Sequence, residues 1–155
     1  MSETFTTAAF SLNLKLPGDD RLGEQALRNR DTVLSAYRDL AAGDEAALMN
    51  ILDPDVLFCQ APGLPYGGEA RGIEATMRMV GEMFAWWSAV NVDVLDIAAG
   101  ANSVIAHLML DNTARATGDK YTGPTTELFS FRNGKVNEWR VIYWDTHGVR
   151  VACGL

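Results

Sequence analysis

Apolar residues in the first half of the chain recur at the spacing of a helix face. Ile73, Met77, Val80 and Phe84 lie at i, i+4, i+7 and i+11, which predicts a helix with one buried side. An earlier stretch has the same periodicity, and Gly43 can end it. The predicted helices span residues 20–42, 45–52 and 73–84.

The pattern then changes to the alternation of strands. The predicted strands span residues 56–60, 91–99, 103–113, 121–132 and 135–144, with a Gly- and Pro-rich loop over 61–71. Asn133-Gly134 is a favoured hairpin turn. Helices followed by consecutive antiparallel strands predict an α+β domain, with the helices packed on one face of a curved sheet.

Both ends of the chain fall outside this pattern. Leu12, Leu14 and Leu16 alternate with polar residues before Pro17-Gly18. This alternation permits an edge strand or a dimer-contacting arm, but a frayed terminus is the favoured interpretation. The predicted division is an N-terminal arm over 1–19, the domain over 20–150 and a C-terminal tail over 151–155.

Composition narrows the classes of partner. The chain has 155 residues, 48% hydrophobic, and 13 Lys and Arg against 20 Asp and Glu, for a net charge of -7. Such a balance argues against nucleic acid or an anionic membrane as partner. Cys59 and Cys153 are interpreted as free thiols, and the N-terminus does not look like a signal peptide. We therefore expect a cytoplasmic protein.

Several short motifs occur in a specific order. They are residues 37–44 (YRDLAAGD), 52–56 (LDPDV), 67–68 (GG), 71–72 (RG), 129–136 (FSFRNGKV) and 143–145 (YWD). Together they resemble the nuclear transport factor 2-like superfamily, in its SnoaL-like and ketosteroid isomerase-like branch, over about residues 25–148. The resemblance implies a cone-shaped α+β barrel. In it a strongly curved antiparallel sheet wraps around a pocket that three N-terminal helices close. It also implies a homodimer or higher homo-oligomer.

Two carboxylates are the leading catalytic candidates. Glu127 shares a strand face with Phe129, and the resemblance places it where the isomerases keep a protonated aspartic acid. A salt bridge to Arg140 or Arg115, or exposure to solvent, is the alternative. Asp145 ends the last predicted strand in the aromatic–aromatic–Asp pattern of the SnoaL-like branch, whose cyclases use an aspartate as acid/base. It could instead cap the turn over residues 146–148.

Other expected isomerase groups are missing or displaced. Gln60 falls at the position of the general base, and an amide does not accept a proton at neutral pH. The helix tyrosine of the family aligns one position before Tyr37. Steroid isomerisation is therefore disfavoured. His107 lies in the middle of an apolar strand, where a structural role is favoured. If it faces the pocket, it could form an acid/base pair with a carboxylate.

The remaining candidates are groups for binding a substrate. They are Tyr37, Gln60, Tyr66, Trp87, Phe129, Trp139 and Tyr143, although core packing would use the same residues. No zinc spacing, phosphate-binding glycine loop or G-x-S-x-G elbow is present in the sequence, so no metal or cofactor is predicted.

These observations favour a cofactor-independent acid/base enzyme. Its substrate would be a small hydrophobic molecule, aromatic or polycyclic. The reaction would be proton abstraction followed by isomerisation, cyclisation or elimination. One alternative is a non-catalytic ligand-binding or dimerisation domain. Another is a dehydratase, carbon–carbon lyase or epoxide-hydrolase-like enzyme that uses a His–carboxylate pair.

Overall fold

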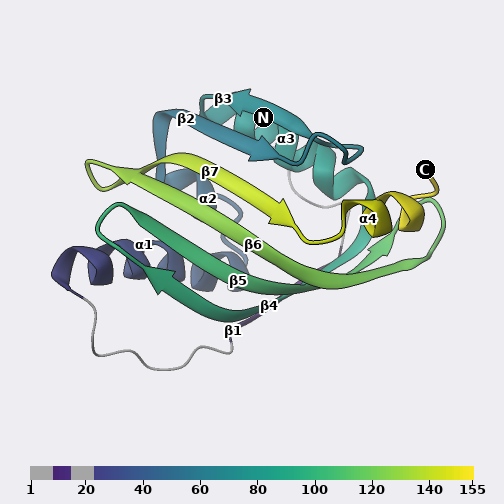
Figure 1. The fold of residues 1–155 in the computed structure, drawn as a ribbon, viewed down its shortest axis with the longest axis horizontal. Coiled ribbons are helices and arrows are strands. Elements are labelled where there is room, and N and C mark those ends of the chain that lie inside the picture. The colour runs from purple at the N-terminus through teal and green to yellow at the C-terminus, as the bar shows by residue number, and fades with distance from the viewer. Residues whose placement is uncertain (1–8, 15–22) are drawn as a thin grey trace.

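The computed structural model describes residues 9–14 and 23–155. Its seven strands form one curved sheet in the order β1-β4-β5-β6-β7-β2-β3, and α1, α2 and α3 lie behind this sheet in Figure 1. The elements are β1 (Ala9–Leu14), α1 (Glu24–Ala41), α2 (Ala47–Asn50), β2 (Leu52–Gln60), β3 (Gly68–Arg71), α3 (Ile73–Ala85), β4 (Trp87–Ala99), β5 (Ser103–Ala114), β6 (Lys120–Arg132), β7 (Lys135–Tyr143) and α4 (Thr146–Ala152).

The predicted cone-shaped α+β fold with three N-terminal helices is confirmed, but the sheet stays open and is mixed. Strands β4 to β7 pair antiparallel in chain order. The expectation of a wholly antiparallel sheet is wrong at two places, since β1 pairs parallel with β4 and β2 parallel with β7. Side-chain alternation carries no information on strand direction, so the sequence pattern could not reveal these two pairings.

Part of the predicted arm belongs to the sheet. β1 forms an edge strand in which Leu12 pairs with Val92 of β4, so the favoured interpretation of a frayed terminus is wrong for residues 9–14. Leu16, Pro17-Gly18 and the predicted helix start at residue 20 lie outside the described residues. β3 lies inside the predicted 61–71 loop, and α4 crosses the predicted boundary between domain and tail at residues 150–151.

Local chemistry fixes α1 over the sheet. The helix is followed by Gly43 at φ 98°, a left-handed conformation that suits glycine after a C-terminus. The amide of buried Asn29 donates to the backbone oxygens of Gly100 and Ala101, both at 3.0 Å. These bonds tie α1 to the β4–β5 turn, and the side of the helix that carries Tyr37 faces the sheet.

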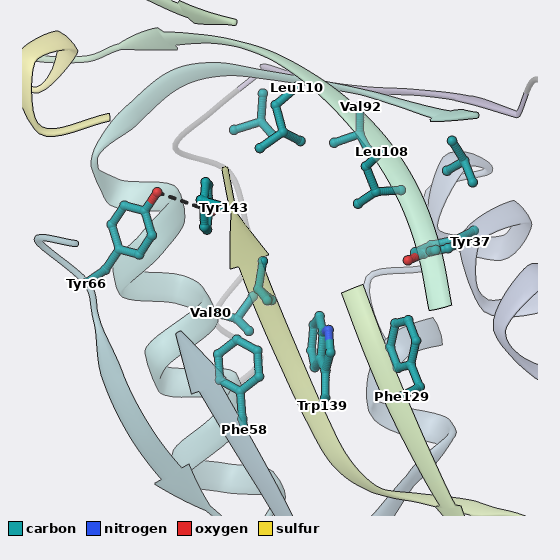
Figure 2. Packing of buried hydrophobic residues seen from close by; sticks show 14 of the residues in the cluster. Tyr37, Phe58, Tyr66, Val80, Val92, Leu108, Leu110, Phe129, Trp139 and Tyr143 are labelled. Atoms are coloured by element: carbon teal, nitrogen blue, oxygen red, sulfur yellow. Dashed lines mark hydrogen bonds between the residues drawn. The ribbon is translucent and has the colours of Figure 1, made fainter. Parts of the chain in front are cut away.

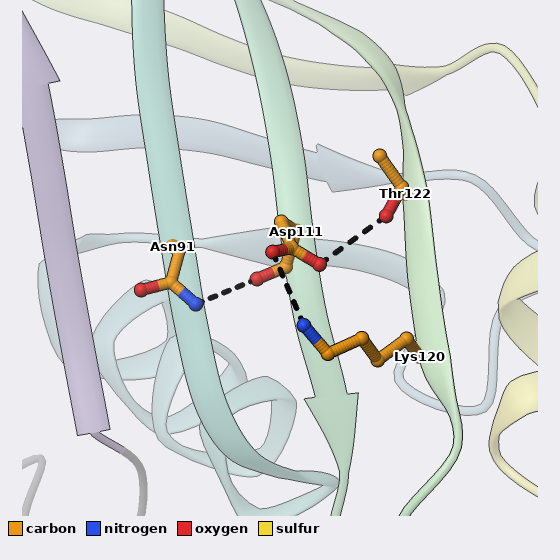
Figure 3. A network of polar contacts seen from close by, with 4 residues as sticks. All are labelled: Asn91, Asp111, Lys120 and Thr122. Atoms are coloured by element: carbon orange, nitrogen blue, oxygen red, sulfur yellow. Dashed lines mark hydrogen bonds and ion pairs between the residues drawn. The ribbon is translucent and has the colours of Figure 1, made fainter.

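The core lies between the helices and the inner face of the sheet, and aromatic rings fill one end of it. Figure 2 shows Trp139 between Phe58 and Phe129. Its ring centroid is 4.5 Å from that of Phe58 and 5.8 Å from that of Phe129, which stacks on it. None of the helices in the described chain is both long and apolar enough to cross a membrane.

Candidate functional site

A cavity of about 80 Å³ lies between the three N-terminal helices and the inner face of the sheet. Most of its lining is apolar. The polar residues on its wall are Tyr37, Gln60, Asn112, Thr125, Glu127 and Tyr143. The volume is small beside the ~300–1,000 Å³ of common ligand pockets, and also beside the roughly 150 Å³ cavity known to hold benzene. At about half the volume of the benzene cavity, it would take a single ring only after its wall side chains move apart.

Glu127 of β6 faces this cavity and meets α1. It lies opposite Val141 of β7 and Ala106 of β5. The hydroxyl of Tyr37 donates a hydrogen bond to Glu127 Oε2. The inward orientation inferred from strand alternation therefore agrees with the structure, and the tyrosine is the partner of this carboxylate.

Burial changes the acidity of both groups in this pair. Loss of solvation raises the pKa of Glu127 from 4.5 to about 7, although the Tyr37 hydrogen bond acts in the opposite direction. Burial also raises the pKa of Tyr37, and the nearby Glu127 charge adds to this effect. Near neutral pH, Glu127 can therefore both accept and release a proton, while Tyr37 keeps its hydroxyl proton.

The salt bridges considered for Glu127 do not form. Arg140 pairs with Glu138 at 2.8 Å. Arg115 donates to the backbone oxygens of Ala85 and Trp87 at 3.0 and 2.6 Å. Both guanidinium groups have other partners, and the pKa of Glu127 is set by burial and by the Tyr37 hydrogen bond.

A second polar chain runs along another wall of the cavity. The Tyr66 hydroxyl donates to the Tyr143 hydroxyl at 3.2 Å, and Tyr143 donates to Met83 Sδ at 3.9 Å. Burial raises the pKa of both tyrosines. Both hydroxyls stay protonated, and Tyr143 lines the cavity.

Asp145 and His107 lie away from the cavity. β7 ends at Tyr143, and the exposed Asp145 becomes the N-cap of α4, with Oδ1 accepting from the Gly148 backbone N–H at 2.8 Å. This is the capping role that the sequence left open. His107 is exposed on the other face of β5, between inward Ala106 and Leu108. The condition for a His–carboxylate pair in the pocket is therefore not met.

The predicted binding residues divide into two groups. Tyr37, Gln60, Trp87, Trp139 and Tyr143 line the cavity. Phe129 does not line it and instead packs behind, edge-on to Tyr37 and stacked on Trp139. Tyr66 does not line it either, and its hydroxyl donates to that of Tyr143, which does.

Sequence reasoning missed several wall residues. Asn112 and Thr125 lie on inward positions of β5 and β6, and Phe10 and Leu12 enter from β1. Strand alternation was a sufficient signal for Thr125, which shares its face with Glu127. For β1, only the pairing with β4 shows that the arm reaches the cavity.

The curved sheet, the helices on its inner face and the cavity between them define the nuclear transport factor 2-like class of fold. An NTF2-like protein of unknown function from Burkholderia pseudomallei has a TM-score of 0.75 and 18% identity, covering 83% of this chain and 98% of its own. Among the described residues, no group of three or more His, Cys, Asp or Glu could hold a metal ion.

Residues 33–139 match the family model of the SnoaL-like domain, so the chain belongs to this family. A putative SnoaL-like polyketide cyclase from a Jannaschia species has a TM-score of 0.73 and 19% identity, over 88% of this chain and 97% of its own. TerC, co-crystallised with polyporic acid, has a TM-score of 0.73 and 15% identity, over 83% and 99%. A comparison with curated protein sequences found no match.

Proposed function

We propose that the chain is an acid/base enzyme for a small hydrophobic molecule, with Glu127 as the group that accepts and returns the proton. The observation that carries this proposal is a carboxyl with a pKa of about 7, hydrogen-bonded to Tyr37 on the wall of an apolar cavity. A general base is most effective when its pKa lies near the working pH.

The proposed step begins with ionised Glu127. Its carboxylate takes a proton from a carbon next to a ligand carbonyl. The C–H electron pair forms a carbon–carbon double bond, and the carbonyl π pair moves onto the oxygen to give an enolate. Where a neighbouring carbon–carbon double bond is conjugated with the enolate, return of the proton at its far carbon completes an isomerisation. Attack of the enolate carbon on a second carbonyl completes a cyclisation, and Glu127 then gives its proton to the new alkoxide. Tyr37 stabilises the ionised form of Glu127 by its hydrogen bond.

The fold relatives support the substrate class in this proposal. One is described as a putative polyketide cyclase and another was crystallised with polyporic acid. For this chain they support a small organic ligand. The cavity volume of about 80 Å³ is closer to the space that one ring needs than to that of a polycyclic substrate.

Deuterium exchange tests the proposal without knowledge of the natural substrate. Cyclohexanone is incubated with the protein in D₂O, and loss of its α-proton signal is followed by NMR. We expect wild-type protein to accelerate exchange, and the exchange rate should increase with pH around a midpoint of about 7, as Glu127 ionises. Glu127→Gln should lower the rate at least about 100-fold. Glu138→Gln, on β7 outside the cavity lining, is the matched control and should leave the rate unchanged.

A non-catalytic ligand-binding domain is the second candidate, favoured by Gln60 at the position where the family's isomerases have their base. Binding of cyclohexanone without any exchange above the buffer rate would support this candidate. It would also refute the acid/base proposal for enolisable ketones.

A further inference from the structure

Polar atoms without partners gather on the cavity wall. Among the described residues, seven buried side-chain atoms have no hydrogen-bond partner, and four of them belong to residues that line the cavity. These four are Gln60 Oε1, Asn112 Oδ1, Thr125 Oγ1 and Trp139 Nε1, on side chains that are 2–4% exposed. Each unpaired buried atom costs about 1–3 kcal/mol. Their concentration around one cavity indicates that they serve a ligand.

Three of these residues surround Glu127 in the sheet. Gln60 of β2 and Glu127 of β6 both pair with Val141 of β7, so they lie two strands apart, at about 10 Å for ~4.8 Å per strand. Trp139 lies two residues before Val141 on the same face of β7. Thr125 lies two residues from Glu127 on β6. A ligand held by these groups would therefore lie against the Glu127 carboxyl.

The unpartnered donors and acceptors on the wall indicate which hydrogen-bonding groups a ligand needs. Gln60 Oε1 is a carbonyl oxygen and can only accept, while the amide nitrogen of the same side chain donates to Met83 Sδ at 3.4 Å. Trp139 Nε1 can only donate, and the Thr125 hydroxyl can do both. A hydroxyl group on the ligand can accept from the indole and donate to the amide oxygen. An apolar group leaves all these atoms unpaired.

Charge and shape narrow the ligand further. No Lys or Arg belongs to the described residues that line the cavity, and Glu127 would repel an anion when ionised. The wall includes Phe58, Trp87 and the Trp139 indole, which Figure 2 shows between two phenylalanines. Aromatic walls of this kind suit a flat ring.

We propose that the cavity binds a neutral, hydroxylated aromatic ring, whose oxygen accepts from Trp139 Nε1 and whose hydroxyl donates to Gln60 Oε1. This inference rests on the cavity being the ligand site of the proposed function. It adds that the substrate contains such a ring, with the carbonyl of the acid/base step on a substituent of the ring. Gln60 thereby recognises substrate at the position where the family's isomerases have a base.

Phenol and toluene test this inference, because they have nearly the same shape and only phenol has the hydroxyl. Binding of each is measured by NMR titration of the whole protein. We expect wild-type protein to prefer phenol by about tenfold or more. Gln60→Leu and Trp139→Phe should each reduce the preference to within about threefold. Thr76→Val should retain it, because that variant removes an unpartnered buried hydroxyl outside the cavity lining.

Several results would overturn the inference. They are equal or tighter binding of toluene, binding of neither compound, and a phenol preference that survives in both Gln60→Leu and Trp139→Phe. A thermal unfolding curve of each variant shows whether it folds, and if one does not, the other decides. The two variants remove different atoms on different strands, so each tests the site alone.

Glu127→Gln separates this inference from the proposed function. A phenol preference that is lost in Glu127→Gln and kept in Gln60→Leu and Trp139→Phe places the hydroxyl on Glu127. In that case the proposal that Gln60 recognises the ligand hydroxyl is wrong, while the proposal of acid/base chemistry at Glu127 is unaffected. If the phenol preference depends on Gln60 and Trp139 but the protein does not accelerate deuterium exchange of cyclohexanone, the hydroxyl-recognition inference is supported and the acid/base proposal for enolisable ketones is refuted.

Discussion

Replacing Glu127 with glutamine removes the titrating group of the cavity while keeping its size and an oxygen that accepts the Tyr37 hydrogen bond. Burial holds the pKa of Glu127 at about 7, against an ordinary value of 4.5. Each pKa unit between folded and unfolded protein corresponds to about 1.4 kcal/mol of folding free energy. The difference of about 2.5 units is therefore worth about 3 kcal/mol.

The sign of this effect follows from proton binding. The folded protein holds the Glu127 proton more tightly than the unfolded chain does. The corresponding stability is present below a pH of about 4.5 and is lost as the pH rises through about 7. The unfolding free energy of wild type minus that of Glu127→Gln should therefore fall by about 3 kcal/mol between these limits.

Urea unfolding of both proteins across this pH range measures the difference, and titration of the other carboxylates cancels in the subtraction. Glu138→Gln is the control for removing one negative charge from a chain of net charge -7. Its side chain makes an ion pair with Arg140 outside the cavity lining. A difference curve for Glu127→Gln that stays flat within about 1 kcal/mol, or rises with pH, would show that solvent hydrates this carboxyl and would refute the reasoning.

Three further predictions concern the surroundings of the cavity. Tyr37→Phe removes the hydrogen bond that lowers the pKa of Glu127. A ¹³C NMR titration of the Glu127 carboxyl should therefore give a pKa above about 7, and an unchanged pKa would contradict the Tyr37–Glu127 pairing. Asp145→Ala removes the α4 cap and should cost about 1 kcal/mol in urea unfolding without changing deuterium exchange, whereas lost exchange would return Asp145 to catalysis. Phe10→Ala removes an edge-on contact with Phe84, whose ring centroid lies 5.9 Å from that of Phe10. Phenol should then leave the cavity faster, as measured from NMR line shapes. An unchanged release rate would show that β1 does not cover the cavity.

Much of the candidate site was accessible to strand alternation. Glu127 points inward because residues at even spacing along β6 share its face, and the same rule places Trp139 and Tyr143 on the inner face of β7. The rule fails for Asp145 because β7 ends two residues earlier and α4 begins. An alternation argument holds only while the strand continues, and the sequence pattern did not reveal where this strand ends.

The sequence by itself determined the order of most helices and strands, the α+β class and the inward side of the central strands, because these properties follow from local periodicity. Tertiary structure decided that Tyr37 meets Glu127, that β1 joins the sheet as an edge strand and that Gln60 and Glu127 pair with the same residue of β7, Val141. These features depend on strand register and helix placement, which bring together residues up to 90 positions apart. Tertiary structure also decided the pKa of Glu127, because burial by segments distant in the chain changes its acidity more than any sequence neighbour does.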